Sequence, residues 1–171
     1  NDITLTYDNG SYIVYNNEVY ELDKISFFTD SAHKIDSESY PIEMNLYHRS
    51  PNTGKIVIIS VMCNVNASAS KSHSTLEVFA TAFPKLGKEH SMSTSSDWNI
   101  FEVLPEIKSF YTYEGSLPRA PCDEGVQWIV FENSVNCSAT FLGNLKPKLK
   151  NKARPLQRLN ARKVYYNTNY E

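Results

Sequence analysis

Residues 111–130 read YTYEGSLPRAPCDEGVQWIV and carry the most specific fold information in this chain of 171 residues. The stretch overlaps two strand candidates, Phe110–Tyr113 and Val126–Phe131, which are rich in aromatic and β-branched residues. Farther along the chain, Ser138–Leu145 suggests a short helix. From Lys146 onward the alternation Lys-Pro-Lys-Leu-Lys-Asn-Lys predicts an extended segment.

The residues before this stretch also predict mostly strands. Three short candidates are punctuated by the turn-forming groups Asp8-Asn9-Gly10 and Asn16-Asn17, which predicts a meander. These candidates are Ile3–Tyr7, Ser11–Tyr15 and Val19–Leu22. Longer candidates follow at Lys24–Thr29, Ile42–His48 and Lys55–Val65. The last is apolar enough to be a central strand, so the sequence predicts a β-dominated chain.

One helix is expected between these two groups of strands. Its apolar residues recur at helical spacing at Leu76, Phe79, Phe83 and Leu86. Ser74 or Thr75 can cap it, and Pro84 ends it early.

The composition fits one globular domain that spans residues 1–171. Hydrophobic residues make up 41% of the chain and aromatic residues 12%, which is ordinary for such a domain. The longest apolar run, Ile56–Val65, is too short to cross a bilayer, and the first residues show no signal-peptide pattern. We therefore expect no membrane span, and a chain that is soluble as given or was processed before this form.

The formal net charge of −2 is unevenly distributed. Residues 133–170 hold eight Lys or Arg and no Asp or Glu, whereas residues 1–132 hold nine basic and eighteen acidic residues. Such asymmetry indicates either a surface for a polyanion or a basic strip that complements the acidic part of the same fold. Nucleic-acid binding is not expected, because there is no zinc-finger spacing, helical basic region or aromatic-basic platform.

The three cysteines, Cys63, Cys122 and Cys137, show no C-x-x-C spacing, which argues against zinc-ribbon and thioredoxin-type sites. An odd number fits a free thiol or a partner outside the chain. The glycosylation sequons at Asn9, Asn66 and Asn136 weakly favour an extracellular or surface location over an intracellular or organellar assembly.

Three segments together resemble the alpha-class carbonic anhydrases. Residues 111–130 are similar to that family's Tyr-Thr-Tyr-x-Gly-Ser-Leu-Thr-Thr-Pro-Pro-Cys-x-Glu-x-Val-x-Trp signature, and Arg154–Val164 to its Arg-Pro-x-Gln-x-Leu-Asn-x-Arg motif. The third segment is Tyr20–His48. The resemblance implies a β-dominated α/β fold, in which a central twisted, mostly antiparallel sheet carries a few short peripheral helices.

The resemblance also implies a degenerate metal site. The family binds zinc through three histidines, and the matching positions here are Ser26, Phe28 and Asn45. Neutral imidazoles keep zinc positively charged with one open position, so that a bound water ionises near neutral pH. A hydroxyl, a phenyl ring and an amide do not make such a ligand set. We expect no metal cofactor and no catalytic residues, that is, a pseudoenzyme.

Other positions of the family's mechanism differ as well. A threonine that orients the hydroxide, and the glutamate that holds it, correspond here to Pro118 and Ala32. The carbon dioxide pocket is matched by Val57, Leu117 and Trp128, but Tyr47 stands where the family has a valine. Its ring is expected to fill the cavity.

The supporting residues of the family are kept. His33, Glu43 and Tyr113 match a buried hydrogen-bonded cluster that ties adjacent strands together, and His48 also keeps its place. A displaced metal ligand or a general base is the functional alternative for His33.

The family begins several dozen residues earlier, with a segment containing Gln-Ser-Pro-Ile, so the domain is expected to lack the N-terminal part of the fold. In secreted members of the family, the cysteine that corresponds to Cys122 forms a disulfide with a cysteine of that segment. Cys122 itself is therefore expected to be free or bonded to another chain. Strand adjacency in the family further suggests a disulfide between Cys63 and Cys137.

The resulting hypothesis is a non-catalytic binding or recognition module for a sulfated polysaccharide or a protein partner. Its candidate polyanion-binding residues are Lys146, Lys148, Lys150, Lys152, Arg158 and Arg119. The four lysines would share one side of an extended segment because side chains in a strand alternate with a period of two. The alternatives are a structural accessory subunit of a larger assembly and, more remotely, a residual carbonate dehydratase or esterase.

Overall fold

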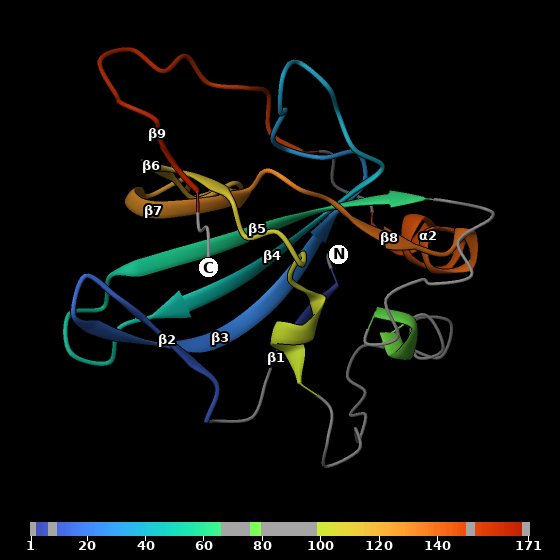
Figure 1. Ribbon diagram of the computed structural model, residues 1–171, viewed down its shortest axis with the longest axis horizontal. Coiled ribbons are helices and arrows are strands. Elements are labelled where there is room, and N and C mark those ends of the chain that lie inside the picture. Colours follow the sequence, from blue (N-terminus) through green and yellow to red (C-terminus); the bar gives the residue numbers. More distant parts are fainter. Residues whose placement is uncertain (1–2, 7–9, 66–75, 80–98, 150–152, 169–171) are drawn as a thin grey trace.

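A computed structural model describes residues 3–6, 10–65, 76–79, 99–149 and 153–168. Within them, nine strands form one sheet with the order β1-β3-β4-β5-β7-β6-β9, while β2 pairs with β3 and β8 pairs with β5 (Figure 1). The strands are β1 (Thr4–Thr6), β2 (Tyr12–Tyr15), β3 (Glu18–Phe28), β4 (Ile42–Arg49), β5 (Ile56–Val65), β6 (Phe110–Ser116), β7 (Glu124–Phe131), β8 (Val135–Cys137) and β9 (Tyr165–Asn167).

The expected fold class is confirmed. All strand pairs are antiparallel except those of β5 with β7 and β8, so the sheet is mixed but mostly antiparallel. The helical elements are short: α2 (Ala139–Leu145), η2 (Ile100–Val103) and η3 (Lys146–Lys148). No helix among the described residues is long and apolar enough to cross a membrane.

Strand β5 lies at the centre of the sheet, as its apolar sequence predicted. Seven consecutive residues, Val57–Cys63, are buried because both faces of the sheet are covered. On one face, β3, β4 and β5 pack against α2, where Phe27 and Phe141 meet edge to face at 6.0 Å. The other face carries a smaller apolar cluster around Trp128.

The N-terminal strands differ from a meander. The expected strands Val19–Leu22 and Lys24–Thr29 merge into the single strand β3, which ends at Phe28 and has a register shift between Leu22 and Lys24. Strand β1 pairs with β3 rather than with β2, because the eleven-residue β3 is long enough to take both short strands along one edge. The turn Asn16-Asn17 is confirmed, and both of its residues have positive φ (47° and 61°), as a tight hairpin turn requires.

The expected extended segment from Lys146 is wrong at its start. Lys146–Lys148 form η3, which continues α2, because the proline lies in the first turn of the 3-10 helix, where its missing N–H costs nothing. The expected helix after Ser74 is helical at Leu76–Phe79, and its remaining positions lie outside the described residues.

Candidate functional site

The three positions that the family resemblance assigns to metal ligands lie together on one face of the sheet. Ser26 on β3 stands directly opposite Asn45 on β4, and Phe28 lies two residues along the same strand. Ser26 is 4% exposed, and the other two side chains are fully buried. Alternation along the strands thus brings the three side chains to one place below the surface.

The side chains at these positions make few polar contacts. The Ser26 hydroxyl donates to the Tyr47 hydroxyl at 3.4 Å, which is a long hydrogen bond. Both polar atoms of the Asn45 amide are buried without a hydrogen-bond partner among the described residues. Over the Phe28 ring lies the guanidinium of Arg119, 4.3 Å from the ring centroid, and its Nη2 donates to the Phe27 carbonyl at 3.2 Å.

These residues do not fit the zinc ion that the family implies. The set offers one hydroxyl and one amide, the weakest of the side-chain donors for zinc, and a phenyl ring that donates nothing. A guanidinium next to this position adds a positive charge where a cation would have to sit. Across the described residues, no group of three or more His, Cys, Asp or Glu side chains is arranged to hold a metal ion.

Next to these positions, His33, Glu43 and Tyr113 form a hydrogen-bonded chain across three segments of the fold. His33 Nδ1 lies 2.9 Å from Glu43 Oε1, and the His33 backbone N–H donates to Glu43 Oε2 at 2.8 Å. His33 Nε2 lies 2.6 Å from the Tyr113 hydroxyl, and the Ser60 hydroxyl donates to Glu43 Oε1 at 3.0 Å. Nδ1 donates its proton to the Glu43 carboxylate, and Nε2 shares the second hydrogen bond with the Tyr113 hydroxyl.

The electrostatics of this chain favour an ionised Glu43. Burial by itself raises the pKa of this carboxyl, but the His33 charge and three hydrogen bonds outweigh burial and hold the pKa below its usual range. Burial, followed by the nearby Glu43 charge, raises the pKa of Tyr113 well above its ordinary value. Each nitrogen of the His33 ring already has a hydrogen-bond partner. These hydrogen bonds tie the β3–β4 loop to β4 and β6 and leave no ring nitrogen of His33 for a metal ion.

The expected pocket residues separate between the two faces of the sheet. Tyr47 and Trp128 are buried in the smaller apolar cluster, and Leu117 packs against it. Val57 does not join them: it pairs with His48 in the register of β4 and β5 and belongs to the core on the opposite face. Ile58, one residue later, faces the cluster instead, because successive side chains of a strand alternate between faces.

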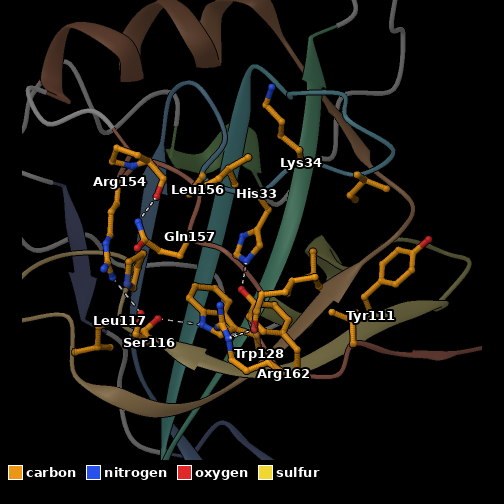
Figure 2. A pocket seen from close by; sticks show the side chains of 18 of the residues that line it. His33, Lys34, Tyr111, Ser116, Leu117, Trp128, Arg154, Leu156, Gln157 and Arg162 are labelled. Atoms are coloured by element: carbon orange, nitrogen blue, oxygen red, sulfur yellow. Dashed lines mark hydrogen bonds between the residues drawn. The ribbon is translucent and has the colours of Figure 1, made fainter.

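A pocket of about 430 Å³ opens above this cluster (Figure 2). It lies between the β3–β4 loop, which supplies Ala32 and His33, and the C-terminal segment 154–164, with Pro118 and Trp128 also among its lining residues. Gly115 keeps the floor compact, since a Cβ there would lie 2.8 Å from the Tyr113 ring and 2.9 Å from the Trp128 ring. Those two rings stack 6.3 Å apart.

The pocket residues to which sequence reasoning gave no site role include Arg154 and Arg162. Arg154 donates to the Ser116 hydroxyl at 3.1 Å, and Arg162 donates to the Glu114 carbonyl at 3.3 Å. Both arginines belong to the C-terminal motif quoted above, so the sequence contained the signal but not their place beside the sheet.

The expected polyanion-binding residues that the structure describes belong to three different segments of the chain. In η3, Lys146 is exposed and Lys148 is half-buried. Residues i and i+2 of a 3-10 helix lie about 240° apart around the axis, so these two lysines point to different sides. Arg119 is half-buried, and its guanidinium contacts Phe27 and Phe28. Arg158 is exposed on the C-terminal segment, and Lys150 and Lys152 lie outside the described residues.

The expected disulfide between Cys63 and Cys137 is also wrong, since all three cysteines are free thiols. In the parallel pair of β5 and β8, Cys63 stands opposite Val135 and Cys137 opposite Val65. The offset of two residues is about 6.6 Å along the strands and the strands lie about 4.8 Å apart, which gives a Cα separation of about 8 Å. A disulfide needs at most about 6.8 Å.

Comparison with known proteins gives a consistent set of relatives. The sequence profile of the eukaryotic-type carbonic anhydrases matches residues 10–168. A carbonic anhydrase from Nostoc sp. is 28% identical over 162 residues, which cover 95% of this chain and 60% of that protein. Dioscorin DB3S from Dioscorea polystachya is 29% identical over 162 residues, which cover 92% of this chain and 59% of that protein.

Solved structures agree with these sequence relatives. The alpha-carbonic anhydrase of Thermovibrio ammonificans, in complex with the inhibitor sulfanilamide, has a TM-score of 0.85 and 31% identity, covering 95% of this chain and 70% of that chain. A dioscorin complexed with ascorbate has a TM-score of 0.79 and 26% identity, covering 98% of this chain and 70% of that chain. The chain described here spans about 60% of the length of the two curated relatives named above.

Proposed function

Because the chain belongs to the eukaryotic-type carbonic anhydrase family, we propose that it is a non-catalytic member of that family and acts as a binding protein. The observation that carries the proposal is the group Ser26, Phe28 and Asn45, which meets on one face of β3 and β4 where the family would need three imidazoles. Arg119 on the Phe28 ring supports it, since a positive charge there opposes a bound metal ion.

Two further replacements point the same way. Ala32 and Pro118, at the positions of the family's proton-accepting pair, have neither a carboxylate nor a hydroxyl, so they cannot orient a nucleophilic water. Tyr47 is buried in the apolar cluster, where its ring takes up space that a smaller aliphatic side chain would leave for a substrate.

The test is a metal analysis combined with a carbon dioxide hydration assay. Purified protein is incubated with excess zinc, dialysed, and measured for bound zinc and for proton release from dissolved carbon dioxide. We expect neither stoichiometric zinc nor a rate above that of buffer. One zinc ion per chain, or a rate that acetazolamide-type sulfonamides suppress, would show a residual carbonate dehydratase and contradict the proposal; an ester substrate tests the esterase alternative in the same way.

For the ligand, a sulfated polysaccharide remains part of the proposal. The exposed Lys146 and Arg158 support it, whereas the contacts of Arg119 with Phe27 and Phe28 do not. We expect retention on a heparin column beyond physiological salt, where the screening length is about 8 Å, and earlier elution of a Lys146→Glu, Arg158→Glu variant. The exposed Lys55 provides the matched control, Lys55→Glu. Equal elution of all three proteins would remove the polysaccharide from the proposal.

A protein partner, or a role as an accessory subunit, is the second candidate. A specific observation favours it: large apolar side chains are exposed along the C-terminal segment, notably Leu156 at 61% and Leu159 at 50%. Exposed apolar patches commonly mark interaction sites. The dioscorin relative that was solved with ascorbate shows that a small organic molecule can be bound on this fold, so a small ligand is an outcome that the experiments below also test.

A further inference from the structure

The C-terminal segment 154–164 stands away from the sheet (Figure 1). Residues 155–161 are all exposed, and the side-chain hydrogen bonds that join the segment to the sheet come from Arg154 and Arg162, near its two ends. The pocket of about 430 Å³ lies on one side of the segment, and a second hollow of about 1190 Å³, between the segment and β6, lies on the other. The segment is thus anchored at both ends, and its middle packs little against the sheet.

The apolar residues of this segment extend beyond the pocket. Leu156, Leu159 and Val164 line the pocket and are 61%, 50% and 43% exposed. Directly after them, on the edge strand β9, Tyr165 and Tyr166 are 61% and 50% exposed. A small molecule seated in the pocket would leave most of this surface in water, whereas a polypeptide can cover the pocket and the adjoining residues together.

The sheet edge beside the pocket suits an extended chain. In the described part of the protein, β9 is the last strand of the sheet order, and β6 is its one strand partner there. An added strand can bond to such an edge through its backbone while its alternate side chains enter neighbouring pockets.

The charges around the pocket select for an acidic residue. Its lining includes the cations Lys34, Arg154 and Arg162 and one carboxylate, Asp36. Figure 2 shows Arg154 reaching toward Ser116 at the pocket wall. That bond uses one of the five N–H donors of the guanidinium, so its planar edge can still take a carboxylate in bidentate fashion.

We propose that this groove, formed by segment 154–164, the β3–β4 loop and the outer edge of β9, binds an extended segment of a partner polypeptide with an aliphatic side chain and a nearby Asp or Glu. The aliphatic side chain enters the pocket among Leu156, Leu159 and Val164, and the carboxylate pairs with Arg154. The inference extends the proposed binding role, but it rests on the groove and not on the metal-ligand positions. Zinc retention or hydration activity would overturn the non-catalytic assignment and leave this inference standing.

The probe is a displayed library of random peptides of about eight residues, which span about 26 Å when extended. The whole chain is used as bait, and enriched peptides are synthesised and titrated against it. We expect enrichment of peptides with an aliphatic residue close to an Asp or Glu. Leu156→Asp should weaken the best peptide at least about tenfold, because it places a charge against the apolar side chain.

Arg154→Glu should shift the selected peptides from acidic to basic residues, a change that a merely structural role of Arg154 would not produce. Ile107→Asp provides the matched control, because Ile107 is an aliphatic residue of similar exposure, 64%, that does not line the pocket. The Ile107→Asp variant should bind the same peptides with unchanged affinity.

Four results would overturn the inference. The first is that no peptide is enriched more strongly by the unmodified chain than by the Leu156→Asp variant. The second is that Ile107→Asp weakens peptide binding as much as Leu156→Asp does. The third is concentration-dependent self-association in sedimentation experiments that Leu156→Asp abolishes, which would assign the groove to a second copy of this chain. Occupation of the pocket by ascorbate or octanoate without any peptide binding would likewise make it a small-molecule site and contradict the proposal.

Discussion

Three histidine substitutions should create a zinc site in this protein, and Arg119 should limit its affinity. In the register of β3 and β4, Ser26 and Asn45 are direct partners, with Cβ atoms about 5 Å apart. Phe28 follows Ser26 on the same face after about 6.6 Å. Imidazoles at these positions could meet one ion at Zn–N distances of about 2.0 Å. The variant Ser26→His, Phe28→His, Asn45→His is therefore expected to bind one zinc ion.

The magnitude of the Arg119 effect follows from its place in the structure. Its guanidinium lies 4.3 Å from the Phe28 ring centroid, so a zinc ion held by an imidazole at position 28 would lie about 5 Å from a positive charge. A double charge and a single charge at that distance repel by roughly 7 kcal/mol at an effective dielectric constant of about 20. The guanidinium can turn toward solvent, but even a third of this energy weakens zinc binding about fiftyfold.

The assay is competition with a chromophoric zinc chelator, and the comparison adds Arg119→Ala or Arg119→Lys to the three histidines. The alanine variant should bind zinc at least about fiftyfold more tightly than the triple variant, while the lysine variant, which keeps the charge, should gain little. The reasoning is refuted if the alanine and lysine variants bind alike, or if the unmodified chain binds zinc as tightly as the triple variant.

Three further predictions concern stability and thiol chemistry. Asn45→Leu should raise the free energy of unfolding by about 1–3 kcal/mol in urea titrations, because the buried amide has no partner among the described residues; an unchanged midpoint would show that the amide is satisfied in solution. Burial lowers the pKa of His48 to about 4 from 6.5, so the unfolded chain binds the extra proton between these values. The contribution of the neutral His48 to the free energy of unfolding, about 3 kcal/mol, is complete above pH 6.5 and is lost as the pH falls toward 4. A His48→Leu variant that kept this pH dependence would refute the assignment. Without reduction, mass spectrometry should find Cys63 and Cys137 as thiols, and a thiol reagent should modify the half-buried Cys122 first in native protein; faster modification of either buried thiol would contradict the described packing.

Much of the fold could be predicted because its signals are local. The alternation and apolarity of β4 and β5, the Asn16-Asn17 turn and the short helix α2 depend on neighbours within a few residues. The short strand β9 could not be predicted, since its three exposed residues become a strand only by pairing with β6, some fifty positions earlier in the chain. Register was equally hidden, and a shift of one residue is enough to place Val57 on the opposite face from the expected pocket.

The sequence by itself determined the family and which side chains stand at the positions that the resemblance assigns to metal ligands, because an imidazole is either present at a position or it is not. Only the tertiary structure decided how these side chains are placed: Arg119 lies on Phe28, the Asn45 amide has no hydrogen-bond partner among the described residues, and the segment 154–164 stands off the sheet beside a groove. Such contacts join residues that lie up to about a hundred positions apart. They arise from how the sheet packs and closes, and residue order alone does not contain that information.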